Sequence, residues 1–135
     1  MKNSILTDHT LIIDKLETSI KSNNLNFILG FLPKGSFLVG GYIRDIILGR
    51  EPEKVDFDIV VPFNAIEIGQ KFADNIGSKF IILDKKREVV RIILNNIYID
   101  IANQISSTIE GDLCSRDCSI NAIAFYLIRS VCLIH

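Results

Sequence analysis

Two adjacent glycines, Gly40 and Gly41, constrain the fold more than any other feature of this chain. The apolar run before them, residues 36–39, predicts a short buried strand, and residues 42–48 predict a helix that ends at Gly49. A strand that turns through two glycines into a helix leaves the first N–H groups of that helix open to an anion, so the pattern predicts a phosphate-binding turn. A tight turn that needs glycine only for its backbone angles is the alternative.

The remaining periodicity predicts an α/β (α+β) domain with a small mixed sheet flanked by helices. Apolar runs bounded by turn residues predict further strands at residues 55–61, 79–83, 88–94 and 97–102. Helical spacing of apolar residues predicts helices at residues 11–20, 26–32, 65–76 and 119–124. Asn95 and Asn96 stand between two apolar runs, which indicates a hairpin, and Asp117 is placed to cap the last helix.

The charges of the chain nearly cancel, since 15 basic residues face 16 acidic ones. Domains that grip nucleic acid by themselves are usually basic, so we expect any main grip on RNA to lie elsewhere. No run approaches the roughly 20 apolar residues of a membrane span, and residues 1–10 lack the apolar centre of a signal peptide. We therefore expect no membrane partner and a reducing, cytoplasmic location.

The cysteines invite a zinc interpretation, because Cys114, Cys118, Cys132 and His135 form the pattern C-x3-C-x13-C-x2-H. Their apolar neighbours favour thiols packed as small hydrophobic side chains instead. The odd number of cysteines also argues against a disulfide framework.

Two carboxylates share one face of the predicted strand 55–61. Asp56 and Asp58 are two residues apart, and because side chains alternate along a strand, both point to the same side at a separation of about 6–7 Å. Such a pair repels itself unless a cation lies between the carboxylates. Mg²⁺ takes one or two carboxylates together with phosphate oxygens, so the pair suits a two-metal phosphoryl-transfer site. Two aspartates on the solvent face of an edge strand are the alternative.

Arg44 strengthens the phosphate interpretation because it follows the glycine turn by one helical turn. Its guanidinium can donate a fork of hydrogen bonds to phosphate oxygens. The glycine turn, this arginine and the aspartate pair in the next predicted strand together are much more specific than any one of them.

A third carboxylate, Asp100, stands in the predicted strand 97–102. Isoleucines fill one face of this strand, and Tyr98 and Asp100 lie on the other. If the strand lies beside the one that carries Asp56, Asp100 joins the site as a metal ligand or as the base for an attacking hydroxyl. A single acid on a half-exposed strand is the alternative.

Arg116 and Asp117 stand at the start of the predicted helix 119–124, and Asn121 follows one turn later on the same side. An arginine suits a triphosphate, and an aspartate can accept hydrogen bonds from ribose hydroxyls. Plain helix capping by Asp117 is the alternative.

Two long segments resemble one family. FLVGGYIRDIILGREPEKVDFDIVV (residues 37–61) closely resembles the first motif of class II tRNA nucleotidyltransferases (CCA-adding enzymes) and bacterial poly(A) polymerases, GG-x-x-RD-x-LLG-x-x-x-x-D-x-D. DLCSRDCSINAIAF (residues 112–125) is similar to their second motif, DL-x-RRDFTINA. The resemblance implies a polymerase-β-like nucleotidyltransferase head over residues 37–135, truncated at its C-terminus, after an N-terminal helical extension over residues 1–36.

The resemblance also implies a chemistry. The 3′-hydroxyl of a tRNA or another RNA attacks the α-phosphate of CTP or ATP with two Mg²⁺, and pyrophosphate leaves, as in CCA addition or poly(A) addition. The implied metal ligands are Asp56 and Asp58, and Asp100 is the implied third catalytic carboxylate. The implied nucleotide-binding residues, to which helical spacing adds Asn121, are Gly40, Gly41, Arg44, Arg116 and Asp117.

The chain departs from the family pattern in two ways. Ser115 stands where the family has the first arginine of RRD, and Cys118-Ser119 replaces Phe-Thr, so we expect one phosphate or sugar contact to be lost. The family's E-D-x-x-R helices, which select CTP or ATP, and its helical body have no counterpart in this sequence. We therefore expect a separate helical body domain or chain as a partner. A truncated or pseudoenzyme module that binds nucleotide without independent turnover is the alternative.

Overall fold

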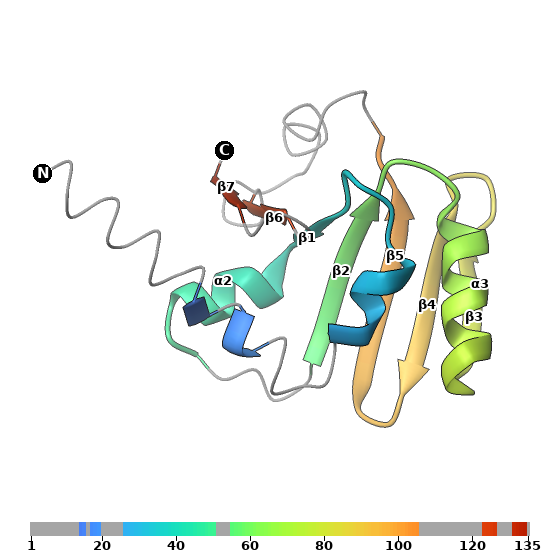
Figure 1. Cartoon of the computed structure of the whole chain (residues 1–135), viewed down its shortest axis with the longest axis horizontal. Coiled ribbons are helices and arrows are strands. Elements are labelled where there is room, and N and C mark those ends of the chain that lie inside the picture. Colours follow the sequence, from blue (N-terminus) through green and yellow to red (C-terminus); the bar gives the residue numbers. More distant parts are fainter. Residues whose placement is uncertain are drawn as a thin grey trace, which may run out of the picture.

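The computed structural model describes residues 14–15, 17–19, 26–50, 55–105, 123–126 and 131–134. Within these residues seven strands form one mixed sheet, in the spatial order β3-β4-β5-β2-β1-β6-β7 (Figure 1). The strands are β1 (Phe37–Val39), β2 (Val55–Val61), β3 (Lys79–Asp84), β4 (Val89–Leu94), β5 (Ile97–Asn103), β6 (Ile123–Tyr126) and β7 (Val131–Ile134). The helices are the 3-10 helix η1 (Asn26–Phe31), α2 (Gly41–Ile47) and α3 (Ala65–Ile76). Residues 14–15 and 17–19 are helical as well.

The sheet is mixed because β2 and β5 are parallel while every other pair of neighbours is antiparallel. The chain leaves β2, crosses one face of the sheet as α3, and returns through two hairpins to β5. The second hairpin turns at Asn95, which has the positive φ of 54° that asparagine tolerates. The mixed sheet, the hairpin and the helix at residues 65–76 are thus confirmed.

One face of the sheet is apolar and carries the helices; we call it the helix-covered face. Side chains alternate along the strands, and β2, β4 and β5 each send buried aliphatic or aromatic side chains to this side. They form one cluster with Phe72 of α3 and with Tyr42 of α2, whose ring lies 4.2 Å from that of Phe57. The strand residues of the cluster are Leu38, Phe57, Ile59, Val61, Val90, Ile92, Ile99 and Ile101.

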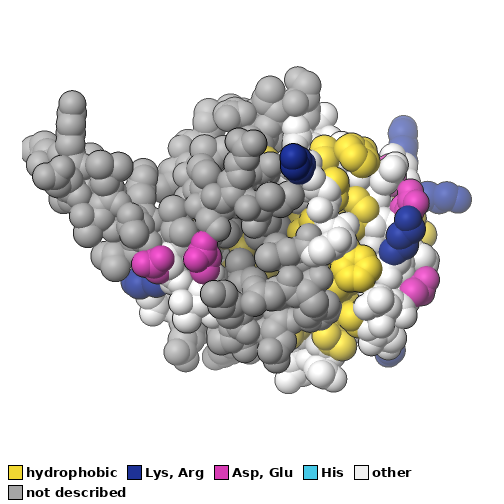
Figure 2. Space-filling model, viewed as in Figure 1, with side chains coloured by type: hydrophobic (Ala, Val, Ile, Leu, Met, Phe, Trp, Pro, Cys, Tyr) yellow, Lys and Arg dark blue, Asp and Glu magenta, His cyan; other side chains and the backbone are white. Residues whose placement is uncertain are grey.

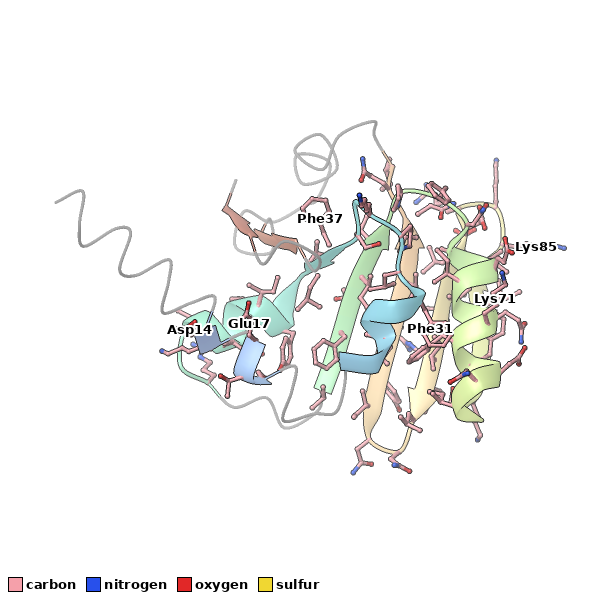
Figure 3. All side chains as sticks on the ribbon, in the orientation of Figure 1. Asp14, Glu17, Phe31, Phe37, Lys71 and Lys85 are labelled. Carbon is pink, nitrogen blue, oxygen red and sulfur yellow. The ribbon has the colours of Figure 1, made fainter. Side chains whose placement is uncertain are left out.

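The blue η1 and the green α3 lie in front of the strands in Figure 1, and hydrophobic side chains gather between α3 and the grey residues in Figure 2. Phe31 of η1, labelled in Figure 3, meets Phe72 edge-on with 5.4 Å between the ring centroids. Ile28 and Leu32 also belong to the core cluster, so residues before 37 help to close the helix-covered face. The domain boundary after residue 36 stays a prediction.

Two side chains from other elements hold the first turn of α3. The backbone N–H of Ala65 donates to Asn103 Oδ1 at 2.9 Å, and that of Ile66 donates to Glu88 Oε1 at 3.4 Å. Asn103 Nδ2 in turn donates to Glu88 Oε2 at 2.7 Å. Because the residue before α3, Asn64, makes no side-chain cap of its own, these contacts satisfy N–H groups that the helix cannot pair internally.

The prediction of a helix over residues 119–124 is wrong at Ile123 and Ala124, which belong to β6; residues 119–122 lie outside the described residues. The edge of β1 that faces away from β2 would otherwise present unpaired N–H and C=O groups. Strand β6 pairs with that edge, with Phe37 opposite Tyr126, and β7 pairs with β6. Long-range pairing therefore overrides the local helical spacing. The described part of the chain holds no helix long and apolar enough to cross a membrane.

Candidate active site

The three candidate carboxylates lie on the side of the sheet opposite the helix-covered face, which we call the acidic face. Strand β2 is central, between β5 and β1, so its aspartates are not on an edge strand. The parallel register pairs Asp58 with Asp100 and Asp56 with Tyr98. Paired residues of neighbouring strands point to the same side. Asp100 therefore lies beside the aspartate pair, which was the condition for Asp100 to join the site.

The carboxylates are reachable from solvent. Asp56 is exposed, and Asp58 and Asp100 are half-buried, whereas Phe57 between the two aspartates of β2 is buried on the helix-covered face. The alternation predicted from the sequence is therefore present, and the helices leave this part of the acidic face open among the described residues.

The glycine turn meets the aspartate pair. Gly40 has φ 86°, a conformation that favours glycine. A side chain at this position would also have no room, because its Cβ would lie 2.7 Å from Asp58 Oδ2. The turn and the second aspartate thus touch, although they are far apart in the sequence.

Arg44 lies back over the start of α2. One of its terminal nitrogens is 3.2 Å from the place where a Cβ on Gly41 would stand, and both Nε and Nη2 donate to Asp45 Oδ1 at 3.4 Å. The guanidinium is therefore beside the glycine turn, where the sequence pattern predicts a phosphate.

Arg91 of β4 is a neighbour of this site that the sequence analysis missed. Its Nε donates to Asp100 Oδ1 at 2.8 Å and its Nη2 to Oδ2 at 2.9 Å, so the pair is bidentate. The hydrogen bond to Asp100 raises the pKa of Arg91, and the charges of Asp100 and Asp56 add to that effect, while burial opposes it. The pairing of Arg91 with Asp100 could have been predicted from the sequence, because a two-residue loop at Asn95-Asn96 places residue 91 opposite residue 100.

Magnesium fits the donor set of this face. No group of three His, Cys, Asp or Glu side chains among the described residues is placed to hold one ion. Mg²⁺ does not require such a group, because it is commonly bound by one or two carboxylates plus phosphates and water. Asp56 and Asp58 are two carboxylates of the kind such an ion takes, and the glycine turn lies close to Asp58.

Several predicted residues lie outside the described ones: Arg116, Asp117, Asn121, Cys114, Cys118 and His135. Cys132 belongs to β7, but the placement of its side chain is not described. A hollow of about 320 Å³ between η1 and α3, lined by Phe31 and Phe63 among others, is on the helix side and holds none of the candidate residues.

Residues 36–104 match the family described as the poly(A) polymerase head domain. The chain belongs to this family. The match includes Gly40, Gly41, Arg44, Asp56, Asp58 and Asp100, and it ends before Arg116.

Relatives of this poly(A) polymerase head domain include tRNA nucleotidyltransferases. The CC-adding tRNA nucleotidyltransferase of Synechocystis sp. is 41% identical over 99 residues, which are 73% of this chain and 24% of that enzyme. The Thermotoga maritima CCA-adding enzyme in complex with tRNA_CCA is 34% identical, with a TM-score of 0.63 over 76% of this chain and 26% of that one. A CCA-adding enzyme in complex with CTP is 37% identical, with a TM-score of 0.58 over 67% and 21%. The chain thus spans about a quarter of the length of these relatives.

Proposed function

We propose that this chain is the nucleotide-binding catalytic head of a tRNA nucleotidyltransferase, which transfers CMP or AMP from CTP or ATP to the 3′ end of a tRNA. The observation that carries the proposal is the meeting of the glycine turn with the acidic face, where Gly40 contacts Asp58 and Asp58 is paired with Asp100. The names of the relatives, which include CC-adding and CCA-adding enzymes, support the choice of tRNA as the acceptor.

Each residue has a role that follows from its chemistry. Asp56 and Asp58 would hold Mg²⁺, which would supply positive charge to stabilise the reacting phosphate. Gly40 and Gly41 let the triphosphate approach the backbone, and Arg44 donates to its oxygens. We assign contacts with phosphate and ribose to Arg116 and Asp117, because these residues match the second motif. We assign Asn121 to the same nucleotide-binding group because it follows Asp117 by four residues.

The transfer balances without a further reactant. The 3′-oxygen of the RNA forms a bond to the α-phosphorus, the bond from that phosphorus to the bridging oxygen breaks, and pyrophosphate leaves with its electrons. The proton of the hydroxyl passes to a base; Asp100 on the acidic face is a candidate for that role or for a place among the metal ligands.

The domain organisation belongs to the same proposal. Residues 37–135 form the head, residues 1–36 precede it as a helical extension, and base selection and the main RNA grip come from a helical body domain or chain. The glycines, Arg44 and the metals contact parts that every nucleoside triphosphate shares, and uniform contacts cannot discriminate between bases.

Calorimetric titration of Mg²⁺-ATP and Mg²⁺-CTP into the chain tests the proposal. We expect weak binding with little base preference, and its loss in Asp56→Ala and in Asp58→Ala. Asp74→Ala, an exposed carboxylate on α3, is the matched control and should bind as the wild type does. Unchanged affinity in both site variants would refute the metal assignment.

A second measurement separates binding from turnover. Incubation with labelled CTP or ATP, Mg²⁺ and tRNA that lacks its 3′ end should give little ordered addition by the 135-residue chain alone, because the 3′-hydroxyl is not held in line. Addition should appear when a helical body is supplied. Nucleotide binding that never leads to addition, even then, would favour a module without turnover.

A further inference from the structure

The Arg91–Asp100 ion pair uses both oxygens of a carboxylate that faces the proposed metal site. The two hydrogen bonds measure 2.8 and 2.9 Å, which is the length of strong charge-assisted bonds. On the other side of β5, Asp100 is paired with Asp58 of β2. Asp100 therefore stands between a cation on β4 and a carboxylate on β2.

Arg91 is held in place from two directions. Its guanidinium carbon lies 5.4 Å from the centroid of the Tyr98 ring, in the range of a cation–π contact. Its side chain is 36% exposed and that of Asp100 is 23% exposed, so the pair is neither buried nor freely solvated. The ion pair is thus an ordered feature of the acidic face.

Arg91 is also close enough to interact electrostatically with both Asp100 and Asp56. The charge of Asp56, as well as that of Asp100, helps to raise the pKa of Arg91. A divalent cation at Asp56 and Asp58 would compete with Arg91 for the same negative charge, because two cations close together repel each other.

We propose that Arg91 competes with the divalent cation for Asp100, so that Asp100 joins the metal site only when the Arg91–Asp100 pair opens. This inference rests on the proposed role of Asp56 and Asp58 as metal ligands. It accounts for the finding that no three acidic side chains of the described residues converge on one ion.

The sign of one measurable effect distinguishes this role from simple support of a ligand. If Arg91 only oriented Asp100 for the metal, its removal would weaken metal binding by about 10–100-fold. If Arg91 competes, its removal frees a carboxylate and deletes a positive charge, and both changes strengthen metal binding.

The test is a titration of Mn²⁺, as a probe for Mg²⁺, into the 135-residue chain and its variants. We expect Arg91→Gln to bind Mn²⁺ about three- to tenfold more tightly at moderate ionic strength. Arg87→Gln removes the same charge from the exposed turn between β3 and β4 and should leave the affinity unchanged. Arg91→Lys keeps the charge but loses the fork, so it should give a smaller gain and decides the matter if Arg91→Gln does not fold.

Repeating the comparison in an Asp100→Asn background isolates the competition. Arg91→Gln should then change Mn²⁺ affinity by about twofold or less, because only the through-space charge effect is left. A gain as large as in the wild-type background would mean that Arg91 acts by charge alone, and it would overturn the inference.

Asp56→Asn with Asp58→Asn separates failure of the inference from failure of the proposed function. If that double variant still binds Mn²⁺ like the wild type, the metal assignment fails and the inference fails with it. If the double variant loses Mn²⁺ while Arg91→Gln binds it equally or less tightly than the wild type, the metal assignment stands and competition by Arg91 is refuted.

Discussion

The two faces of the central strands differ in chemistry: one is apolar and buried, and the other carries carboxylates. On the helix-covered face, Phe57, Ile59, Ile99 and Ile101 are buried under α2, α3 and η1. On the acidic face, the residues that alternate with them along the same strands include Asp56, Asp58 and Asp100. A stretch of two strands thus contributes a hydrophobic core to one side and a charged cluster to the other.

Along β2 and β5, residues that stabilise the fold alternate with residues of the candidate site. Burial of apolar area stabilises the fold, whereas like charges placed side by side do not. We therefore expect substitutions under the helices to change the free energy of unfolding and substitutions on the acidic face to change ligand binding. The four predictions below test that separation, from the largest expected effect on stability or ligand binding to the smallest.

Phe72→Ala should lower the free energy of unfolding by about 3–5 kcal/mol, because it opens a cavity at the centre of the helix-covered face. Phe72 is fully buried and packs against Phe31. Urea denaturation followed by circular dichroism measures the loss. Phe63→Ala is the matched control, since Phe63 is 55% exposed, and it should cost far less. Equal costs for the two variants would contradict the location of the core.

Gly69→Ala should destabilise the domain by about 1–2 kcal/mol, although alanine favours helices. A Cβ on Gly69 would lie 2.6 Å from Cγ2 of Val90 and 3.2 Å from the Phe80 ring, so α3 and the sheet would have to separate. Gly30→Ala, where a Cβ would meet nothing within 4 Å, should be neutral in the same urea assay. A stabilised Gly69→Ala protein would show that the contact between helix and sheet is looser than described.

Asp58→Asn should leave the free energy of unfolding within about 0.5 kcal/mol of the wild type, or raise it, when metal is chelated. The substitution keeps the shape of the side chain and removes one of the clustered negative charges. With Mg²⁺ and ATP added, the wild type should gain stability through binding, and the variant should not. Melting curves with and without ligand decide this, and a large loss of stability without ligand would mean that the acidic face also supports the fold.

Lys71→Ala should have the smallest effect, a loss of about 0.3–0.5 kcal/mol at low salt that disappears at high salt. Lys71, labelled in Figure 3, pairs with Glu67 at 3.0 Å on the outer side of α3, and the two side chains are 70% and 59% exposed. Exposed pairs of this kind contribute little. A loss above about 1 kcal/mol would indicate a role for Lys71 beyond the helix surface.

Much of the candidate site was predictable because its residues are marked by local patterns. The glycine turn, the alternation of Asp56 and Asp58, and the apolar face opposite Asp100 depend only on neighbours in the sequence. The pairing of Arg91 with Asp100 was within reach too, because the two-residue loop at Asn95-Asn96 determines the register of its hairpin.

The sequence by itself determined the elements from residue 36 to residue 103 and the side of each strand that is apolar, since helical and strand periods depend on local spacing. Only the tertiary structure decided which strands are neighbours. It placed β5 beside β2, so that Asp100 meets Asp58, and it turned Ile123 and Ala124 into a strand by offering them the free edge of β1. It also capped α3 with Asn103 and Glu88 and pressed Gly40 against Asp58. These contacts join residues that are distant in the sequence, and they form because strand edges and helix ends must satisfy their hydrogen-bonding groups wherever the fold brings partners within reach.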